Sequence, residues 1–422
     1  MQRTAATILA LALCSVASAE TLTGHGGPVM GLDVAPDGRV ATASFDNSVG
    51  LWANGSPRWL EGHAAAVNAV LFTGPETLAS AADDFDVLRW RLDAEDPERL
   101  DGHEGKVMGL AAAGSLLASA SWDGTIGLWP ADGAPRFLDG HDGPVNAVAF
   151  TPDGGALYSA SADGTIREWD PASGAERRTL VDHGFGVNEI VLAQEAGWLA
   201  YGAVDGAVRV VDLQSGEEIA DLSAGRRPIL ALERAPDRSV LAVGDGEGYI
   251  LVADAADWSV RHDFRATDHG PIWALGFAPS GATLYAAGLD SAVHIWPLAN
   301  LGDAEAMPTG AESFLRDPDT MSNGERQFQR KCSICHTLSA DGGRRAGPPL
   351  GGLFGRPAGS VEGYRYSDAL AESDVVWTAE SIDALFDEGP DHYVPGTKMP
   401  MQRIARPEDR ADLVAFLRRA TE

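Results

Sequence analysis

Two cysteines and a histidine stand together in the last quarter of the chain, in the stretch KCSICHT at residues 331–337. Cys332 and Cys335 are three residues apart, and side chains at this spacing share one face of a helix. Their thiols can form thioethers with the two vinyl groups of one porphyrin, which places His336 next to the iron. The spacing predicts one covalently attached haem c, with His336 as an iron ligand.

This motif alone does not separate haem attachment from two other uses of a cysteine pair. A redox-active pair needs the same Cys-x-x-Cys spacing. A zinc site is less favoured, because structural zinc needs more ligands and the remaining cysteine, Cys14, lies near the N-terminus.

A partner ligand on the other side of the iron is offered by YVPGTKMPM at residues 393–401. A Pro-Gly turn precedes Met399, whose neutral thioether is a soft ligand. Ligation by His and Met favours ferrous iron and raises the reduction potential. Met401 and His392 are the alternatives to Met399 in the same stretch.

One helix is expected to position the attachment motif. Ser322 is a suitable N-cap, and the pattern predicts a helix from there through Cys335.

With these residues in view, residues 320–422 resemble a class I cytochrome c of the mitochondrial or bacterial soluble type, an all-α fold. The shared stretches follow the family order and are GERQFQRKCSICHT, AGPPLGGLFGRPAG, YRYSDA, VVWT, YVPGTKM and DRADLVAFLRRAT. The resemblance implies that the carbonyl of Pro348 accepts a hydrogen bond from the ring N–H of His336. It also implies four residues that neutralise or hydrogen-bond the haem propionates: Arg356, Tyr366, Trp377 and Thr397.

The same resemblance implies that Gly324 and Phe328 on a first helix pack against Leu413 and Phe416 on a last one. Phe386 departs from the family, since many relatives have a tyrosine there.

A repeat of 38 to 43 residues runs through residues 20–298. Each unit begins with a Gly-His pair or a similar pair. An acidic turn residue follows later in the unit, and the residue that ends the next strand lies six positions after that acid. The acidic residues are Asp46, Asp84, Asp123, Asp163, Asp205, Glu247 and Asp290, and the strand-ending residues are Trp52, Trp90, Trp129, Trp169, Val211, Ala253 and Trp296. Alternating apolar residues between turn signals indicate antiparallel strands.

This segment resembles the WD-repeat family and is therefore expected to form an all-β, seven-bladed propeller. The family pattern predicts a bonded set of histidine, serine, aspartate and tryptophan in each blade. The predicted sets are His25, Ser44, Asp46, Trp52; His103, Ser121, Asp123, Trp129; and His141, Ser161, Asp163, Trp169.

Blades five and six depart from the pattern, since Val211 and Ala253 replace tryptophan and Arg226 replaces histidine. We expect weaker polar sets there. Residues 20–23 are expected to complete the last blade beside residues 292–296, as a short clasp that is the weakest point of the ring.

The predicted organisation is a signal peptide at residues 1–19, the propeller at 20–298, a partly ordered linker at 299–319 and the cytochrome c domain at 320–422. The leader has one cation, an apolar run and an Ala-x-Ala site before Glu20. We expect cleavage after Ala19 and a periplasmic location, without stable membrane insertion.

The net charge of −29 disfavours a role on nucleic acids or anionic membranes. Residues 310–422 contain 14 basic and 18 acidic residues, which leaves −25 on the rest of the chain. We therefore expect the propeller to dock a protein redox partner.

The expected function is single-electron transfer by one His/Met haem c rather than catalysis of bond chemistry. Two alternatives remain: a redox-sensing interaction scaffold, and an oxidoreductase with a second cofactor in the propeller.

Overall fold

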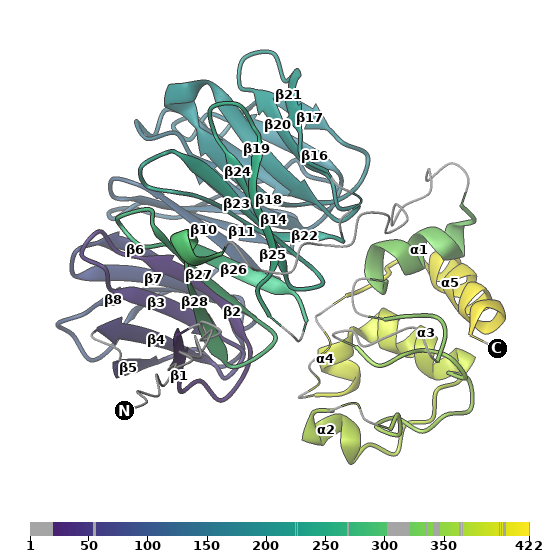
Figure 1. Ribbon diagram of the computed structural model, residues 1–422. Helices are drawn as coiled ribbons and strands as arrows, with labels where there is room; N and C mark the ends of the chain where they lie inside the picture. Colours follow the sequence, from purple (N-terminus) through teal and green to yellow (C-terminus); the bar gives the residue numbers. More distant parts are fainter. Residues whose placement is uncertain are drawn as a thin grey trace, which may run out of the picture.

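The computed structural model contains a large propeller of strands and a smaller helical domain (Figure 1). It describes residues 20–53, 56–223, 225, 227–267, 270–301, 321–333, 336–340, 347–362, 364, 366–395, 397, 399 and 402–421. Arg226, Cys335, Met401 and most of the predicted linker lie outside these residues.

The propeller consists of seven four-stranded antiparallel sheets, as the repeats predict. Blade one is β2 (Val29–Val34), β3 (Val40–Ser44), β4 (Ser48–Ala53) and β5 (Ser56–Glu61); blade two is β6 (Val67–Gly74), β7 (Thr77–Ala82), β8 (Val87–Arg91) and β9 (Glu98–Leu100); blade three is β10 (Val107–Ala113), β11 (Leu116–Ser121), β12 (Ile126–Trp129) and β13 (Arg136–Leu138). Blade four is β14 (Val145–Phe150), β15 (Leu157–Ser161), β16 (Thr165–Trp169) and β17 (Glu176–Asp182); blade five is β18 (Val187–Ala193), β19 (Trp198–Ala203), β20 (Val208–Asp212) and β21 (Glu218–Asp221). Blade six is β22 (Ile229–Arg234), β23 (Val240–Asp245), β24 (Tyr249–Asp254) and β25 (Val260–Arg265); blade seven is β26 (Ile272–Phe277), β27 (Thr283–Gly288), β28 (Ala292–Pro297) and β1 (Glu20–Thr23). Two short 3₁₀ turns cover Gln194–Ala196 and Leu298–Asn300.

The ring closes through its first strand, as predicted. β1 pairs antiparallel with β28, with Glu20 opposite Ile295 and Thr23 opposite Ala292. The seventh blade is therefore built from both ends of the propeller segment, and four residues form its outer strand.

Tight turns connect the second and third strands of the blades. Gly164 occupies the left-handed turn position of blade four with φ +93°, a conformation that glycine adopts without a steric penalty. Blades one and two have Asn47 (φ 71°) and Phe85 (φ 74°) there. The asparagine tolerates this conformation, whereas the phenylalanine is strained by it.

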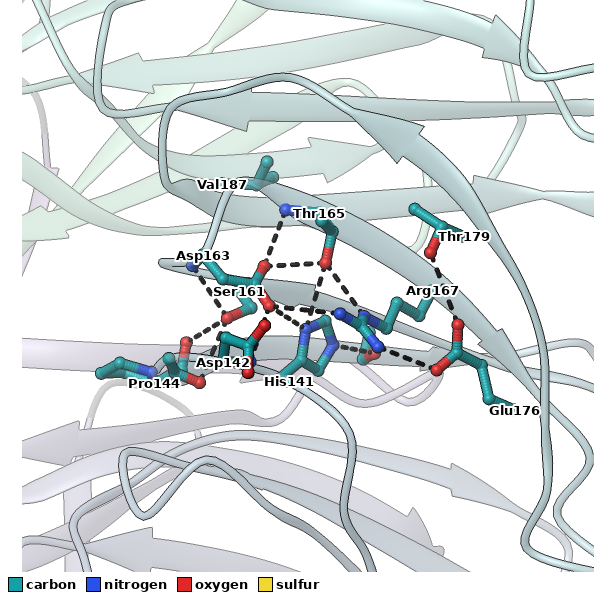
Figure 2. A network of polar contacts seen from close by, with 12 residues as sticks. His141, Asp142, Pro144, Ser161, Asp163, Thr165, Arg167, Glu176, Thr179 and Val187 are labelled. Carbon is teal, nitrogen blue, oxygen red and sulfur yellow. Dashed lines mark hydrogen bonds and ion pairs between the residues drawn. The ribbon is translucent and has the colours of Figure 1, made fainter.

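The predicted polar sets exist, but their serine differs from the prediction. In blade four, the Nε2 of His141 lies 2.7 Å from the hydroxyl of Ser159, and the indole N–H of Trp169 donates to the same hydroxyl at 2.8 Å. Ser161 instead donates to the carbonyl of Pro144 and accepts from the backbone N–H of Asp163. Figure 2 shows the part of this network around His141, Ser161 and Asp163.

The same correction holds in the other two predicted sets. Thr42 and Ser119 bond the histidine and the tryptophan of blades one and three, while Ser44 and Ser121 bond nearby backbone groups. In each of these three blades, the hydroxyl residue that bonds the histidine and the tryptophan lies two residues before the serine predicted from the sequence.

Hydrogen bonds keep the aspartates of these polar sets ionised. Burial raises the pKa of Asp163, but hydrogen bonds from His141 and Thr165 outweigh that effect and hold the pKa well below its usual range. Asp46 and Asp123 behave in the same way with their own histidines.

Blades five to seven have altered sets. In blade five, Tyr201 replaces the hydroxyl partner and lies 3.3 Å from the Nδ1 of His183. In blade six, Arg227 pairs with Glu247 at 2.7 Å, and Arg226 lies outside the described residues. In blade seven, the buried indole nitrogen of Trp296 has no hydrogen-bond partner within the described residues.

The hydrophobic cores lie between neighbouring blades, because a single sheet cannot bury both of its faces. One cluster joins Val49 and Leu51 of blade one to Leu78 and Leu88 of blade two. Stacking of this kind is what holds each polar set in place.

The helical domain is described with five helices within residues 321–421. They are α1 (Asn323–Lys331), α2 (Asp368–Ala371), α3 (Ala379–Glu388), α4 (Pro390–Tyr393) and α5 (Pro407–Ala420). None of the helices in the described part of the chain has the length and apolarity needed to span a bilayer.

The first helix is capped as predicted but is shorter. The hydroxyl of Ser322 accepts a hydrogen bond from the N–H of Glu325, while the helix ends at Lys331 and Cys332 is its C-cap. The predicted extension through Cys335 is wrong at Cys332, where φ is −123° and ψ is −37°.

The terminal helices of this domain cross closely. Phe328 and Phe416 have ring centroids 5.7 Å apart, and Leu413 is fully buried in the same cluster. A Cβ on Gly324 would lie 2.1 Å from the carbonyl oxygen of Asp412. Only glycine permits this approach, which agrees with the predicted packing of α1 on α5.

Candidate haem site

A cavity of about 730 Å³ opens into the helical domain. Its volume lies within the range of cofactor and ligand pockets. Nine of its lining positions are of particular interest, because eight of them were predicted from the sequence and Gly347 shapes the floor. They are Cys332, His336, Gly347, Pro348, Arg356, Tyr366, Trp377, Thr397 and Met399.

The turn after α1 places Cys332 and His336 on the cavity wall. The backbone N–H of His336 donates to the carbonyl of Cys332 at 2.9 Å, which closes a single helical turn beyond the end of α1. Cys332 is 4% exposed. Cys335 falls outside the described residues, so its predicted role remains a prediction.

The imidazole of His336 is held by a backbone carbonyl. Its Nδ1 lies 2.7 Å from the carbonyl oxygen of Pro348, so this nitrogen is the donor of the pair. A bond of this kind fixes the tautomer and leaves Nε2 as the basic nitrogen, which is the form that ligates a metal.

The floor of the cavity beside the imidazole requires a glycine. A Cβ on Gly347 would lie 2.5 Å from Cε1 of His336, well inside van der Waals contact. The missing side chain lets the backbone lie flat against the ring.

Met399 also lines the cavity and packs against the residues of the domain core. Its backbone N–H donates to the hydroxyl of Thr397 at 3.2 Å, and the N–H of Thr397 donates to the carbonyl of Val394 at 3.0 Å. These two bonds hold Thr397 and Met399, both of which line the cavity.

The four predicted propionate residues all line the cavity. Arg356 donates to the carbonyls of Pro349 and Gly351, and burial lowers the pKa of its guanidinium. The hydroxyl of Tyr366 accepts the N–H of Val361 at 3.3 Å, and burial raises its pKa. Of the two consecutive prolines, the carbonyl of Pro349 thus accepts from Arg356, and the carbonyl of Pro348 accepts from His336.

The alternative ligands separate clearly. His392 is exposed, its Nδ1 lies 3.2 Å from the carbonyl of Glu388, and it does not line the cavity. Met401 lies outside the described residues. Among described residues, His336 and Met399 are the histidine and the methionine that share the cavity.

One buried polar atom on the cavity wall fits a guest that carries carboxylates. The hydroxyl of Ser367 is buried and has no hydrogen-bond partner within the described residues, so it can donate to such a group. The wall also has apolar residues, which include Leu350, Leu385 and Phe386. A flat apolar macrocycle with two carboxylates matches these surroundings.

Sequence reasoning missed Arg410. This residue is 6% exposed, pairs with Asp383 and Asp387 of α3, and donates to the carbonyls of Ile404 and Ala405. It therefore ties the segment after Met399 to the helical core. Its position three residues before Leu413, on the apolar stripe of α5, was the available signal.

Comparison with known proteins agrees with this geometry. A family model described as Cytochrome c matches residues 321–421. Cytochrome c of Gibberella zeae is 42% identical over 104 residues, which cover 24% of this chain and 95% of that protein. Cytochrome c of Chlamydomonas reinhardtii is 43% identical over 115 residues, covering 27% of this chain and 99% of that protein.

Through residues 321–421, the chain belongs to the cytochrome c family. It therefore carries covalently bound haem c, and the cavity fits that group in size, shape and donor set. Cytochrome c of Arabidopsis thaliana, 45% identical over 101 residues that cover 24% of this chain and 88% of that protein, gives the same result.

The first part of the chain matches the model described as WD domain, G-beta repeat, at residues 17–53, 96–130, 135–170 and 258–297. The crystal structure of the WD40 beta propeller domain of Doa1 superposes with a TM-score of 0.60 at 23% identity. It covers 66% of this chain and 95% of that chain, and at this identity it shows the fold. A cytochrome c domain indicates haem-based electron transfer, and WD repeats indicate protein interaction.

Proposed function

We propose that the protein is an exported single-electron carrier whose propeller docks its redox partner. The proposal rests on one observation: His336 and Met399 line the same cavity as Cys332. In this proposal Cys332 and Cys335 would form the thioethers, and His336 and Met399 would ligate the iron. When bound, haem supplies a one-electron iron couple.

The residues around the site then have distinct tasks. Pro348 holds the imidazole of His336 as a neutral donor, and Arg410 holds the segment that follows Met399. Arg356 and Tyr366 neutralise or bond the propionates, with Trp377 and Thr397 as their predicted companions. The apolar wall excludes water, which stabilises the ferrous state relative to the more highly charged ferric state.

The propeller serves in this proposal as the docking domain for a protein redox partner. Its supporting features are the repeats themselves and the charge of −25 on the part of the chain before residue 310. An acidic surface attracts a basic partner over long range and raises the association rate at low salt. Partner binding is therefore expected to weaken as the salt concentration rises.

Export to the periplasm is proposed from the leader-like residues 1–19. Cleavage after Ala19 would leave Glu20, the first residue of β1, as the new N-terminus, so the clasp of the propeller is kept whole. Mass spectrometry of the protein from a periplasmic extract tests this, and a mature chain that begins beyond Thr23 would contradict it.

The axial ligand assignment is tested by two matched substitutions, Met399→Leu and Met321→Leu. Met321 is buried at 7% exposure in the same domain but does not line the cavity. We expect Met399→Leu to abolish the sulfur-to-iron charge-transfer band and lower the reduction potential, while Met321→Leu preserves both.

Two results would contradict the proposal. A low-spin, sulfur-ligated spectrum that survives Met399→Leu would exclude Met399 as the ligand. A purified wild-type protein without covalent haem would exclude the carrier function itself.

A further inference from the structure

The mouth of the haem cavity is bounded by the propeller as well as by the helical domain. The propeller contributes loops of three adjacent blades: Gly26–Pro28 of blade one, Gly246–Glu247 of blade six, and Gly270, Trp273 and Leu289–Ser291 of blade seven. In Figure 1 the helical domain lies beside the end of the propeller that carries β22, β25 and β26. We call these loops the haem-facing loops.

Blade seven has a tryptophan at a position that three blades fill with asparagine and that blades one, three and six fill with Met30, Met108 and Leu230. The second residue of the innermost strand is Asn68 in blade two, Asn146 in blade four and Asn188 in blade five. Each asparagine amide donates to a carbonyl of the next blade, at 3.1, 2.9 and 2.8 Å. Blade seven has Trp273 there, and its partly exposed side chain lines the haem cavity instead.

The acidic turn residues also change at the haem-facing loops. The side chains of Asp84 and Asp163 are only 7% and 8% exposed within their polar sets. Glu247 and Asp290 are 41% and 37% exposed and pair with Arg227 and His294. In blades six and seven, two of the three blades that border the cavity, the turn acids have therefore left the interior, whereas blade one keeps Asp46 in its polar set at 20% exposure.

The haem-facing loops supply apolar area for a contact. Trp273 and Leu289 are both partly exposed and line the cavity. The charged lining residues on this side are Glu247, Arg265 and Asp290, which nearly balance. A nearly neutral surface within a strongly acidic propeller is suited to the cytochrome domain, whose own charge is close to balanced.

We propose that the haem-facing loops are a docking surface for the cytochrome domain of the same chain, and that this contact covers part of the mouth of the haem cavity. A redox partner then reaches the haem at the border between the two domains, so that it contacts both. This inference rests on the proposed function for the position of the haem.

Fluorescence quenching by the haem tests the contact in the full-length holoprotein. Ser291→Cys introduces a thiol at a haem-facing loop, and Asp142→Cys introduces one at an exposed loop of blade four. Both cysteines of the mature chain are expected to be in thioethers, so a maleimide dye labels only the new thiol. Because energy transfer falls steeply with distance, we expect strong quenching at position 291 and weak quenching at position 142.

A second pair of variants tests Trp273 itself. Trp273→Asn restores the residue that blades two, four and five use, and Met108→Asn makes the same change at the equivalent position of blade three. We expect Trp273→Asn to shift the docking equilibrium by about tenfold and to reduce the quenching at position 291. Met108→Asn should leave that quenching unchanged.

Three outcomes are distinguishable. Equal quenching at positions 291 and 142, or no effect of Trp273→Asn, would overturn the proposal. Quenching that depends on protein concentration would assign the loops to a second copy and also overturn it. Loss of the haem spectrum in the unlabelled wild type would instead refute the proposed function, before docking is measured.

Discussion

Replacement of Ser159 by alanine tests whether the hydroxyl of Ser159, rather than that of Ser161, stabilises blade four. The side chain of Ser159 receives the indole N–H of Trp169 at 2.8 Å and lies 2.7 Å from Nε2 of His141. Trp169 is 1% exposed, and the side chain of His141 is equally buried. Ser159→Ala therefore leaves two buried polar atoms without a partner.

The size of the effect follows from the cost of such atoms. A buried unsatisfied donor or acceptor costs about 1–3 kcal/mol, so Ser159→Ala should destabilise the propeller by roughly 2–5 kcal/mol. Ser161→Ala should cost about 1–3 kcal/mol, because the N–H of Asp163 loses its acceptor while the carbonyl of Pro144 keeps the N–H of Ala162 as a partner at 2.8 Å. Ser159→Thr keeps a hydroxyl, as Thr42 does in blade one, and should stay close to wild type.

Urea unfolding followed by tryptophan fluorescence measures these differences, with haem absorbance as a separate probe of the cytochrome domain. The expected order of destabilisation is Ser159→Ala, then Ser161→Ala, then Ser159→Thr. A larger loss in Ser161→Ala than in Ser159→Ala would refute the reasoning. So would a Ser159→Thr variant as unstable as Ser159→Ala.

Three further predictions concern the site and the pH dependence. Gly347→Ala places a methyl group within 2.5 Å of the His336 ring, and should cost about 1–3 kcal/mol and weaken the low-spin haem spectrum; an unchanged spectrum and melting temperature would contradict this. Arg410→Lys loses the forked bonds to the carbonyls of Ile404 and Ala405, so it should lower the stability by about 2 kcal/mol and weaken the sulfur-to-iron band; an unchanged band would contradict this. Burial and the nearby Asp33 and Glu189 raise the pKa of Glu233 to about 8, so its protonated form stabilises the native state and this contribution is lost as the pH rises from about 4.5 through 8. Glu233→Gln should then be more stable than wild type by on the order of 1 kcal/mol at pH 9 but not at pH 5 in thermal melts, and an equal difference at both pH values would count against this.

The sequence alone predicted much of the architecture, because its signals are local or regularly repeated. The seven repeats carry their own turn and strand-end residues, so the seven-bladed propeller and even the pairing of residues 20–23 with β28 were predictable. The spacing of Cys332, Cys335 and His336 is set within one helical turn, and Met399 follows a recognisable Pro-Gly turn. These features predict covalent haem c, in agreement with the family comparison.

The tertiary structure decided what local spacing leaves equivalent. Ser159 and Ser161 are two residues apart on one strand and therefore point to the same face, so only the positions of His141 and Trp169 on other segments select Ser159. Arg410 looks like an ordinary helix charge until α3 and the segment after Met399 fold over it. Which face of the propeller borders the haem cavity depends on contacts between residues more than a hundred positions apart. No periodicity along the chain encodes such contacts, because they arise only when the separate elements pack together.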